Sequence, residues 1–342
     1  MENNKPFLEV LQGRKTDRIP FWFMRQAGRY LPEYRELRSR KNGFLDMAFD
    51  SGAACEITLQ PIRRFGMDAA IIFSDILVIP YALGQRLEFL EGEGPKLERL
   101  RTGADIAKLN PGLMERKLSP VYEAIAKVSS KLDDKTALIG FAGAPWTVAT
   151  YMVEGGGSKD FIAVKKMAYS DPQTFAALID LLVESTAHYL IRQVEAGAEA
   201  LQIFDSWSGV LDSDEFRKWV IQPTKQIVDL VRDSYPQIPI IGFPKGAGYN
   251  YMAYAEGTGV NVLGLDSQVP TKWAARVLQP LKPVQGNLDP IALLAGGDAM
   301  KLAAERIIAD LSSGPFVFNL GHGIHKDTPV EHVEQLVKMI RS

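Results

Sequence analysis

Two arginines stand one turn apart near the start of the chain, in the stretch "FMRQAGRYLPEYRELR" (23–38). Each guanidinium of Arg25 and Arg29 can bind a carboxylate through two parallel hydrogen bonds. The alternative is a pair of surface arginines neutralised by nearby glutamates. An apolar run at 19–23 leads directly into them, and Gly28 favours a loop over a helix. This position at the end of an expected strand favours a carboxylate-binding site.

Asp75 follows a second apolar run, 69–73, in the stretch "FSDIL". Its apolar neighbours would surround the carboxyl group, and an ionised carboxylate in such surroundings is costly unless a cation or hydrogen-bond donors meet it. The alternative is an N-cap for a helix that begins near Ile76. The sequence leaves both interpretations open.

Three further polar residues follow later apolar runs: Tyr151 in "YMVEGGGS", Ser206 in "FDSWSG" and His322 in "NLGHGI". A helical tyrosine is most often a core residue, and a serine after a strand often caps a helix or forms a turn. The glycines beside His322 would let the backbone approach a ligand closely. His322 and His325 suggest a metal pair, but no acidic residue stands at a standard ligand spacing, so we expect no metal site.

The elements that must position these residues recur as short apolar runs, each followed by a longer amphipathic stretch. Runs of this kind are typical of parallel strands buried on both faces. Eight of them, alternating with helices, predict a single (β/α)8 TIM-barrel domain over 1–342, in which the loops after the strands carry the active site. The segment 83–100 is predicted to be a hairpin-like insertion. The eight runs are 19–23, 69–73, 137–141, 200–204, 238–243, 261–265, 283–286 and 316–320.

The helical stretches are clearest at 171–199, where Asp171 is a predicted N-cap and Pro172 opens the first turn. The stretches 119–132 and 329–340 show the same apolar spacing. The stretch "FPKGAG" (243–248) lacks the full phosphate-loop pattern, and a turn between strand and helix suffices to explain it.

The composition limits the classes of protein. The net charge of -2 and pI of about 6.2 argue against a general affinity for nucleic acid or anionic membranes. The single cysteine, Cys55, excludes an intramolecular disulfide. The amino terminus shows no signal-peptide pattern, and no apolar run approaches the roughly 18 residues of a membrane-spanning helix. We therefore expect a soluble, cytoplasmic protein.

Taken in order, the motifs above, together with "GAPWT" (143–147), resemble those of the uroporphyrinogen decarboxylase family, from about residue 21 to 325. The resemblance implies a TIM barrel that is usually a homodimer and needs no cofactor or metal. It implies removal of the four acetate carboxyl groups of uroporphyrinogen III, which gives coproporphyrinogen III and CO2 in haem biosynthesis.

Carried over residue by residue, the resemblance implies one central catalytic aspartate, Asp75, which would face the pyrrole N–H groups. The implied substrate-binding residues are Arg25, Gln26, Ala27, Gly28, Arg29, Asp75, Tyr151, Ser206 and His322. The identity of the proton donor stays open. Two alternatives also stay open: a corrinoid-dependent methyltransferase of the same superfamily, and a non-catalytic tetrapyrrole-binding protein.

Overall fold

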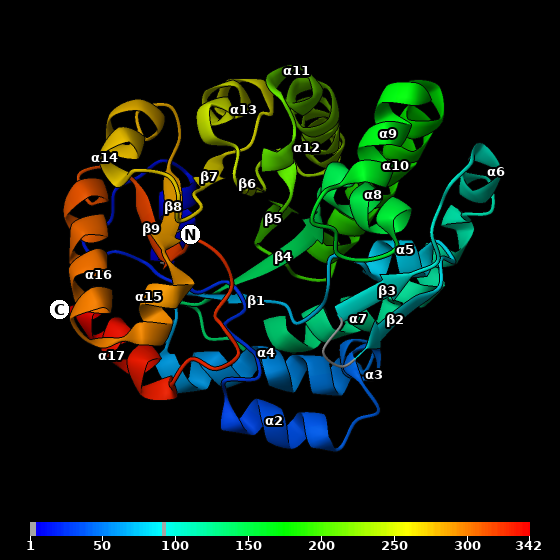
Figure 1. Cartoon of the computed structure of the whole chain (residues 1–342). Coiled ribbons are helices and arrows are strands. Elements are labelled where there is room, and N and C mark those ends of the chain that lie inside the picture. The colour runs from blue at the N-terminus through cyan, green and yellow to red at the C-terminus, as the bar shows by residue number, and fades with distance from the viewer. Residues whose placement is uncertain (1–4, 91–93) are drawn as a thin grey trace.

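A computed structural model of the chain describes residues 5–90 and 94–342. Within these residues, seven strands form one parallel sheet in the order β1-β4-β5-β6-β7-β8-β9, which curls inside a layer of helices (Figure 1). The strand bounds are β1 Ala69–Ile71, β4 Ala137–Gly143, β5 Ala200–Asp205, β6 Ile240–Pro244, β7 Val262–Gly264, β8 Val284–Leu288 and β9 Phe316–Leu320. Seven of the eight predicted runs are therefore strands.

The predicted strand at 19–23 is the exception, because only Phe21 makes an isolated bridge, to Phe318. Proline at position 20 has no N–H to donate. The N–H of Phe21 is taken by the Asp68 carboxylate at 3.0 Å, and the Phe23 carbonyl accepts from the Gln26 N–H in a turn. Side chains and a turn thus satisfy backbone groups that a regular strand would use.

This segment nevertheless contacts both ends of the curled sheet. The Trp22 N–H donates to the Phe318 carbonyl of β9 at 3.3 Å, and the Phe318 N–H donates to the Pro20 carbonyl at 2.9 Å. On the other side, the Asp68 N–H next to β1 donates to the Phe21 carbonyl at 2.9 Å. The chain that leads to Arg25 is thereby held between the first and last strands.

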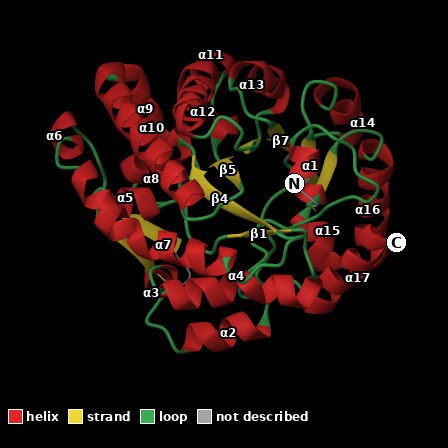
Figure 2. Cartoon of the chain, turned by 180° about the vertical axis from the view of Figure 1, so that it is seen from behind, coloured by secondary structure: helices red, strands yellow, loops and turns green. Residues whose placement is uncertain are grey.

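The helices alternate with the strands along the chain and lie outside the sheet (Figure 2). The α-helices are α1 Pro6–Leu11, α2 Pro32–Ser39, α3 Phe44–Ala48, α4 Ser51–Phe65, α5 Val78–Ala82, α6 Gly103–Ile106, α7 Met114–Ser129, α8 Pro145–Glu154, α9 Ile162–Ser170, α10 Pro172–Glu195, α11 Ser213–Phe216, α12 Gln222–Ser234, α13 Tyr251–Gly257, α14 Thr271–Trp273, α15 Pro290–Ala295, α16 Gly297–Leu311 and α17 Val330–Arg341. Short 3-10 turns are η1 Pro111–Leu113, η2 Ser208–Val210 and η4 Gly248–Asn250, and π-helical turns are η3 Arg217–Ile221 and η5 Ala274–Leu278.

The helix predicted over 171–199 corresponds to α10. Asp171 caps it by accepting from the Thr174 N–H at 3.2 Å, as the sequence indicates. This helix is long and apolar enough to cross a membrane by composition alone. It packs instead on β4 and on helices α8 and α12, and its apolar residues belong to the core. Buried apolar residues from Phe7 to Ile340 form one connected cluster.

The insertion predicted at 83–100 contains an antiparallel hairpin of β2 (Leu87–Leu90) and β3 (Gly94–Leu97). Its tip, 91–93, lies outside the described residues. The hairpin lies beside the curled sheet rather than within it (Figure 1), and Lys96 makes an antiparallel bridge to Gly156 just after α8. The helix that carries Tyr151 is therefore buttressed by the insertion.

We expect Asp68→Ala to lower the free energy of unfolding by about 1–3 kcal/mol, because it leaves the buried Phe21 N–H without its acceptor and removes the partner of Arg18. Urea unfolding measures the change. Asp17→Ala is the control, since Asp17 is exposed and should move stability by less than about 0.5 kcal/mol. Equal stability of the two variants would mean that the hydrogen bond from the Phe21 N–H to Asp68 does not stabilise the fold.

Candidate active site

Asp75 lies in the loop between β1 and α5, and that loop is held from both sides. The Phe73 N–H donates to the Thr58 hydroxyl of α4 at 2.9 Å. A Cβ added at Gly143, the last residue of β4, would lie 2.9 Å from the Cβ of Ile76, so only glycine lets the loop pack so closely on the sheet. The position of Asp75 is thus fixed by its neighbours.

The Asp75 carboxyl group is only partly accessible, and burial raises its pKa to about 6. The Leu77 N–H, which donates to Oδ1 at 2.8 Å, and the positive charge of Arg25 oppose that rise. The alternative interpretation, an N-cap, is not met in its strict form, because α5 begins at Val78 with Leu77 as its cap residue, although Asp75 accepts from the Leu77 N–H just before the helix. Among the described residues, Oδ2 accepts no hydrogen bond, so one oxygen remains for a ligand.

Arg25 lies in a loop, as Gly28 indicates, and has a φ of +56°. A left-handed backbone is unfavourable for arginine and is kept only where the surroundings enforce it. Here the Met24 N–H donates to Asn319 Oδ1 at 3.0 Å, and the Ile324 N–H donates to the Met24 carbonyl at 2.9 Å. Strand β9, through Asn319, and the loop after it, through Ile324, therefore hold Arg25 in its strained conformation.

The glycine after His322, Gly323, leaves room for the Arg25 side chain. A Cβ added at Gly323 would lie 2.4 Å from the Cδ of Arg25, so the arginine side chain crosses the backbone at this point. The sequence predicts that these glycines admit a ligand. The close approach that the structure has at Gly323 is to the chain's own guanidinium side chain.

Tyr151 lies in α8, and its ring stacks on Trp207 with centroids 4.1 Å apart. Burial raises the pKa of Tyr151 to about 12, the charge of Asp75 adds to the rise, and Arg25 opposes it. Trp207 follows β5 and was not singled out from the sequence, although it stands beside Ser206 in a quoted motif. Ser206 is half-buried between Asp205 and Trp207.

His322 is half-buried after β9, and its pKa is lowered to about 4 by burial and by the charges of Lys245 and Arg25. The imidazole is therefore neutral at neutral pH. Lys245 stands directly after β6, in the stretch that the sequence analysis explained as a turn. The rule applied to the other residues, a polar side chain just after an apolar run, would have selected it.

The charge of Arg25 acts on the pKa values of Asp75, Tyr151 and His322. Residues from two loops and one helix are thus gathered around one guanidinium. Arg29 is exposed, as Arg25 is, but its charge acts on Tyr34, where it opposes the rise in pKa that burial causes, and not on Asp75, Tyr151 or His322. Gln26 is fully buried with both amide atoms unpaired among the described residues, and its carbonyl accepts from the Tyr30 hydroxyl. Ala27 and Gly28 are half-buried in the same loop.

A second carboxyl group, that of the buried Asp205, lies in the segment that carries Ser206 and Trp207. Thr147 of α8 donates its hydroxyl to Asp205 and accepts from the Trp207 N–H at 3.1 Å. Burial raises the pKa of Asp205 to about 7. The Asp205–Thr147 contact thus fixes the segment that places Trp207 against Tyr151.

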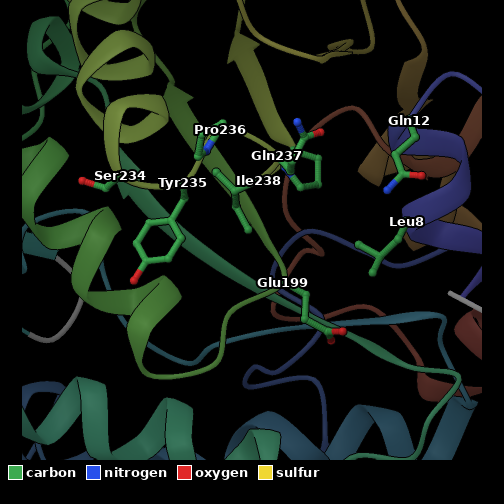
Figure 3. Close-up of a pocket in the computed structure, with 9 residues that line it drawn as sticks. Leu8, Gln12, Glu199, Ser234, Tyr235, Pro236, Gln237 and Ile238 are labelled. Atoms are coloured by element: carbon green, nitrogen blue, oxygen red, sulfur yellow. The ribbon is translucent and has the colours of Figure 1, made fainter. Parts of the chain in front are cut away.

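A surface cavity of about 370 Å³ lies at the opposite ends of the strands (Figure 3). Its wall includes Glu199 and Pro239, which come directly before β5 and β6, whereas Lys245 comes after β6. Glu199 already accepts from Lys5 at 2.7 Å and from the Leu138 N–H at 3.1 Å. The cavity is therefore separate from the candidate site. In the part of the chain that the structure describes, no three histidine, cysteine or acidic side chains cluster as a metal site would require.

The family model described as "Uroporphyrinogen decarboxylase (URO-D)" matches residues 2–342. The chain is 52% identical to uroporphyrinogen decarboxylase from Rhodospirillum rubrum over 341 residues, which cover 100% of this chain and 98% of the relative. It is 54% identical to the enzyme of the same name from Novosphingobium aromaticivorans, with 98% of each chain covered.

Among solved structures, a methyltransferase from Methanosarcina mazei matches with a TM-score of 0.82 and 21% identity, covering 98% of this chain and 97% of that one. A putative vitamin-B12 independent methionine synthase from Listeria monocytogenes matches with a TM-score of 0.56 and 12% identity, covering 96% of each chain. At such low identities the likeness is one of fold alone.

The raised pKa of Asp75 predicts how stability depends on pH. Between about 3.9, the free side-chain value, and about 6, the folded protein keeps a proton that the unfolded chain has lost, so ionisation of Asp75 costs stability as pH rises through this range. We expect Asp75→Asn to be more stable than the wild type at about pH 8 by at most about 3 kcal/mol.

The gain in unfolding free energy of Asp75→Asn should shrink to about half by about pH 5, where Asp75 is mostly protonated in the folded protein and mostly ionised in the unfolded chain. Urea unfolding of both proteins at the two pH values measures it. A difference that does not change with pH would contradict the raised pKa.

Proposed function

The chain belongs to the uroporphyrinogen decarboxylase family, and from that premise we propose that it removes the four acetate carboxyl groups of uroporphyrinogen III to give coproporphyrinogen III and CO2, without a cofactor or metal. The observation that carries the proposal is the Asp75 carboxyl group, partly buried, with one oxygen unused among the described residues and the Arg25 charge acting on it. It is a negative group beside a cation, as a substrate with many carboxylates and a transiently cationic ring requires.

The reaction needs an acceptor for the electron pair of the breaking C–C bond. Protonation of a pyrrole ring carbon makes the ring cationic, and the electron pair of the leaving carboxylate then neutralises it as CO2 departs. The exocyclic carbon that results takes up a proton to become methyl while the ring carbon loses its own. Each cycle therefore consumes one proton and releases one CO2.

Asp75 is proposed to stabilise the cationic ring. In its ionised form it accepts hydrogen bonds from the pyrrole N–H groups, which become more acidic as the ring gains charge. An interaction that strengthens as the charge develops lowers the barrier, and such preorganised electrostatic contacts are usually the largest contribution to catalysis. The partly buried position strengthens the contact, because little water screens it.

The arginines are proposed to bind carboxylates that are charged before and during the reaction. Such contacts contribute about 1.5–3 kcal/mol each to affinity and orient the ring without accelerating the chemical step. Arg25, whose charge acts on Asp75, Tyr151 and His322, is the principal anchor in this proposal, and Arg29, whose charge acts on Tyr34, is a peripheral one. Tyr151, Ser206 and His322 complete the proposed contacts, and the half-buried Ala27 and Gly28 line the same surface, whereas the fully buried Gln26 lies within the loop.

The proposed architecture is an eight-stranded barrel that forms one catalytic domain over 1–342. Its eighth position would be filled by Pro20–Phe23, and the hydrogen bonds of this segment to Phe318 and Asp68 support that assignment. The connected core from Phe7 to Ile340 supports a single domain. We also propose a homodimer, which the resemblance implies, and a cytoplasmic location, which the sequence led us to expect. Light scattering after gel filtration tests the first, and cell fractionation tests the second.

Anaerobic incubation with uroporphyrinogen III tests the function, with chromatography of the hepta-, hexa- and pentacarboxylate intermediates. Their appearance and conversion to coproporphyrinogen III support decarboxylation. Binding without conversion would support a tetrapyrrole-binding protein instead. The family match and the relatives at 52% and 54% identity favour decarboxylation over methyl transfer, because the methyltransferase likeness is confined to the fold.

We expect Asp75→Asn to lower kcat by at least about 100-fold and to change KM less than about threefold, since the lost charge interacts mainly with the cationic ring. Steady-state kinetics with uroporphyrinogen III measures both. Asp233→Asn, an exposed change on α12, is the control and should behave as wild type. Near-normal turnover in Asp75→Asn would refute the role of Asp75.

We expect Arg25→Ala to raise KM by about 10- to 100-fold, because it removes the guanidinium that lies among Asp75, Tyr151 and His322. Arg29→Ala should raise KM less, since the charge of Arg29 acts on Tyr34 and not on Asp75, Tyr151 or His322. The same kinetic assay compares the two variants. A larger effect at Arg29 would mean that the peripheral arginine is the main anchor.

A further inference from the structure

Lys245 brings an additional positive charge to the candidate site. It directly follows β6, so its backbone lies at the same end of the sheet as the loops that carry Asp75 and His322. Its side chain is half-buried, and its charge acts on His322 together with that of Arg25. Two cations from loops far apart in the sequence thus converge on one imidazole.

The backbone around Lys245 is held rigidly by its neighbours. The Lys245 N–H donates to the Asp205 carbonyl at 3.0 Å, while its own carbonyl accepts from the Ser208 hydroxyl at 3.0 Å and from the Gly209 N–H at 3.1 Å. The next residue, Gly246, has a φ of +75° and donates to Asp266 at 2.7 Å. These bonds tie the loops after β5, β6 and β7 together beneath the amine.

The chain itself does not neutralise the Lys245 amine. In the described residues its ammonium group makes no hydrogen bond or ion pair, whereas Lys5 is paired with Glu199 and Lys41 with Asp50. The neighbouring carboxylate of Asp266 already accepts from the Gly246 and Gln268 N–H groups and from the Tyr251 hydroxyl. A half-buried cation without an anion is costly unless a ligand supplies the anion.

We infer that Lys245 binds a peripheral carboxylate of the substrate, which it shares with the neutral imidazole of His322. The inference rests on the proposed function and extends it, because the substrate of that reaction carries eight carboxylates and the sequence motifs supply only Arg25 and Arg29 as cations. Lys245 provides a charge-assisted hydrogen bond, and His322 donates a neutral one.

Kinetics of Lys245→Met, Lys245→Arg and the control Lys272→Met test the inference. Lys272 is an exposed lysine on α14. We expect Lys245→Met to raise KM at least about tenfold with kcat within about threefold of wild type, and Lys245→Arg to recover part of the affinity, because a guanidinium also binds carboxylates. Lys272→Met should match the wild type. An unchanged KM in Lys245→Met, or a fall in kcat alone, overturns the inference.

The position of the amine has an independent readout in the pKa of His322, followed by NMR of its ring protons in the free protein. Removal of one of the two flanking charges in Lys245→Met should raise that pKa, and Lys272→Met should leave it unchanged. No change in Lys245→Met overturns the proposed neighbourhood. If Lys245→Met melts at a lower temperature than wild type, Lys245→Gln, which keeps a polar end group on a side chain one atom shorter, carries both tests.

Failure of the proposed function is distinguishable from failure of this inference. If the wild type does not decarboxylate uroporphyrinogen III, the proposed function fails. The affinity for the oxidised octacarboxylate uroporphyrin, read from quenching of tryptophan fluorescence, then decides the role of Lys245. Weaker binding by Lys245→Met than by wild type and Lys272→Met supports carboxylate recognition, and equal binding overturns it.

Discussion

The electrostatic balance between one partly buried carboxyl group and the cations around it is the constraint on which the rest of the structure depends. Burial disfavours the negative charge of Asp75 and raises its pKa. The Leu77 N–H, which donates to the carboxyl group, and the charge of Arg25 oppose that rise. Arg25 in turn keeps a left-handed backbone, because hydrogen bonds to β9 and to the loop after it fix the preceding residue, Met24. Local strain and local desolvation are both tolerated at one place, and the connected core stabilises the loops that bear them.

The parallel sheet explains why residues more than 200 positions apart can meet. Every strand of the curled sheet runs in the same direction, so the loops that follow the strands lie at one end. Arg25 joins that end although its segment is not a regular strand, because Pro20–Phe23 is hydrogen-bonded to both β9 and Asp68. The opposite end carries the cavity beside Glu199, where the acidic group is already paired with Lys5.

The sequence predicted most strands and the longest helix, because buried parallel strands and amphipathic helices leave strong periodic patterns. It did not predict the irregular course of 19–23, since that depends on the Asp68 side chain replacing a strand partner. The family resemblance selected the motif residues. It did not predict that Arg25 and Arg29 have different neighbours, because this depends on the left-handed backbone of Arg25 (φ +56°), which no sequence pattern encodes. Lys245 was missed for a different reason. Its stretch was tested only as a phosphate loop, and its lack of a partner becomes visible only in three dimensions.

The charge distribution also constrains how the substrate can lie in the proposed reaction. A carboxylate held by Arg25 or Lys245 is stabilised as an anion, and it loses that stabilisation when it becomes neutral CO2. The cations must therefore bind carboxylates that stay, while the reacting acetate lies against less polar surface, where loss of its charge is favoured. Aromatic rings provide such a surface at the same end of the sheet. Tyr151 stacks on Trp207, and the half-buried Phe204 packs edge to face on Phe243, with ring centroids 5.9 Å apart. Since each of four acetates must reach this surface in turn, the ring has to be released and rebound, or rotated, between steps. Several separate cations, each adequate for any carboxylate of the periphery, permit that exchange better than one site shaped for a single group.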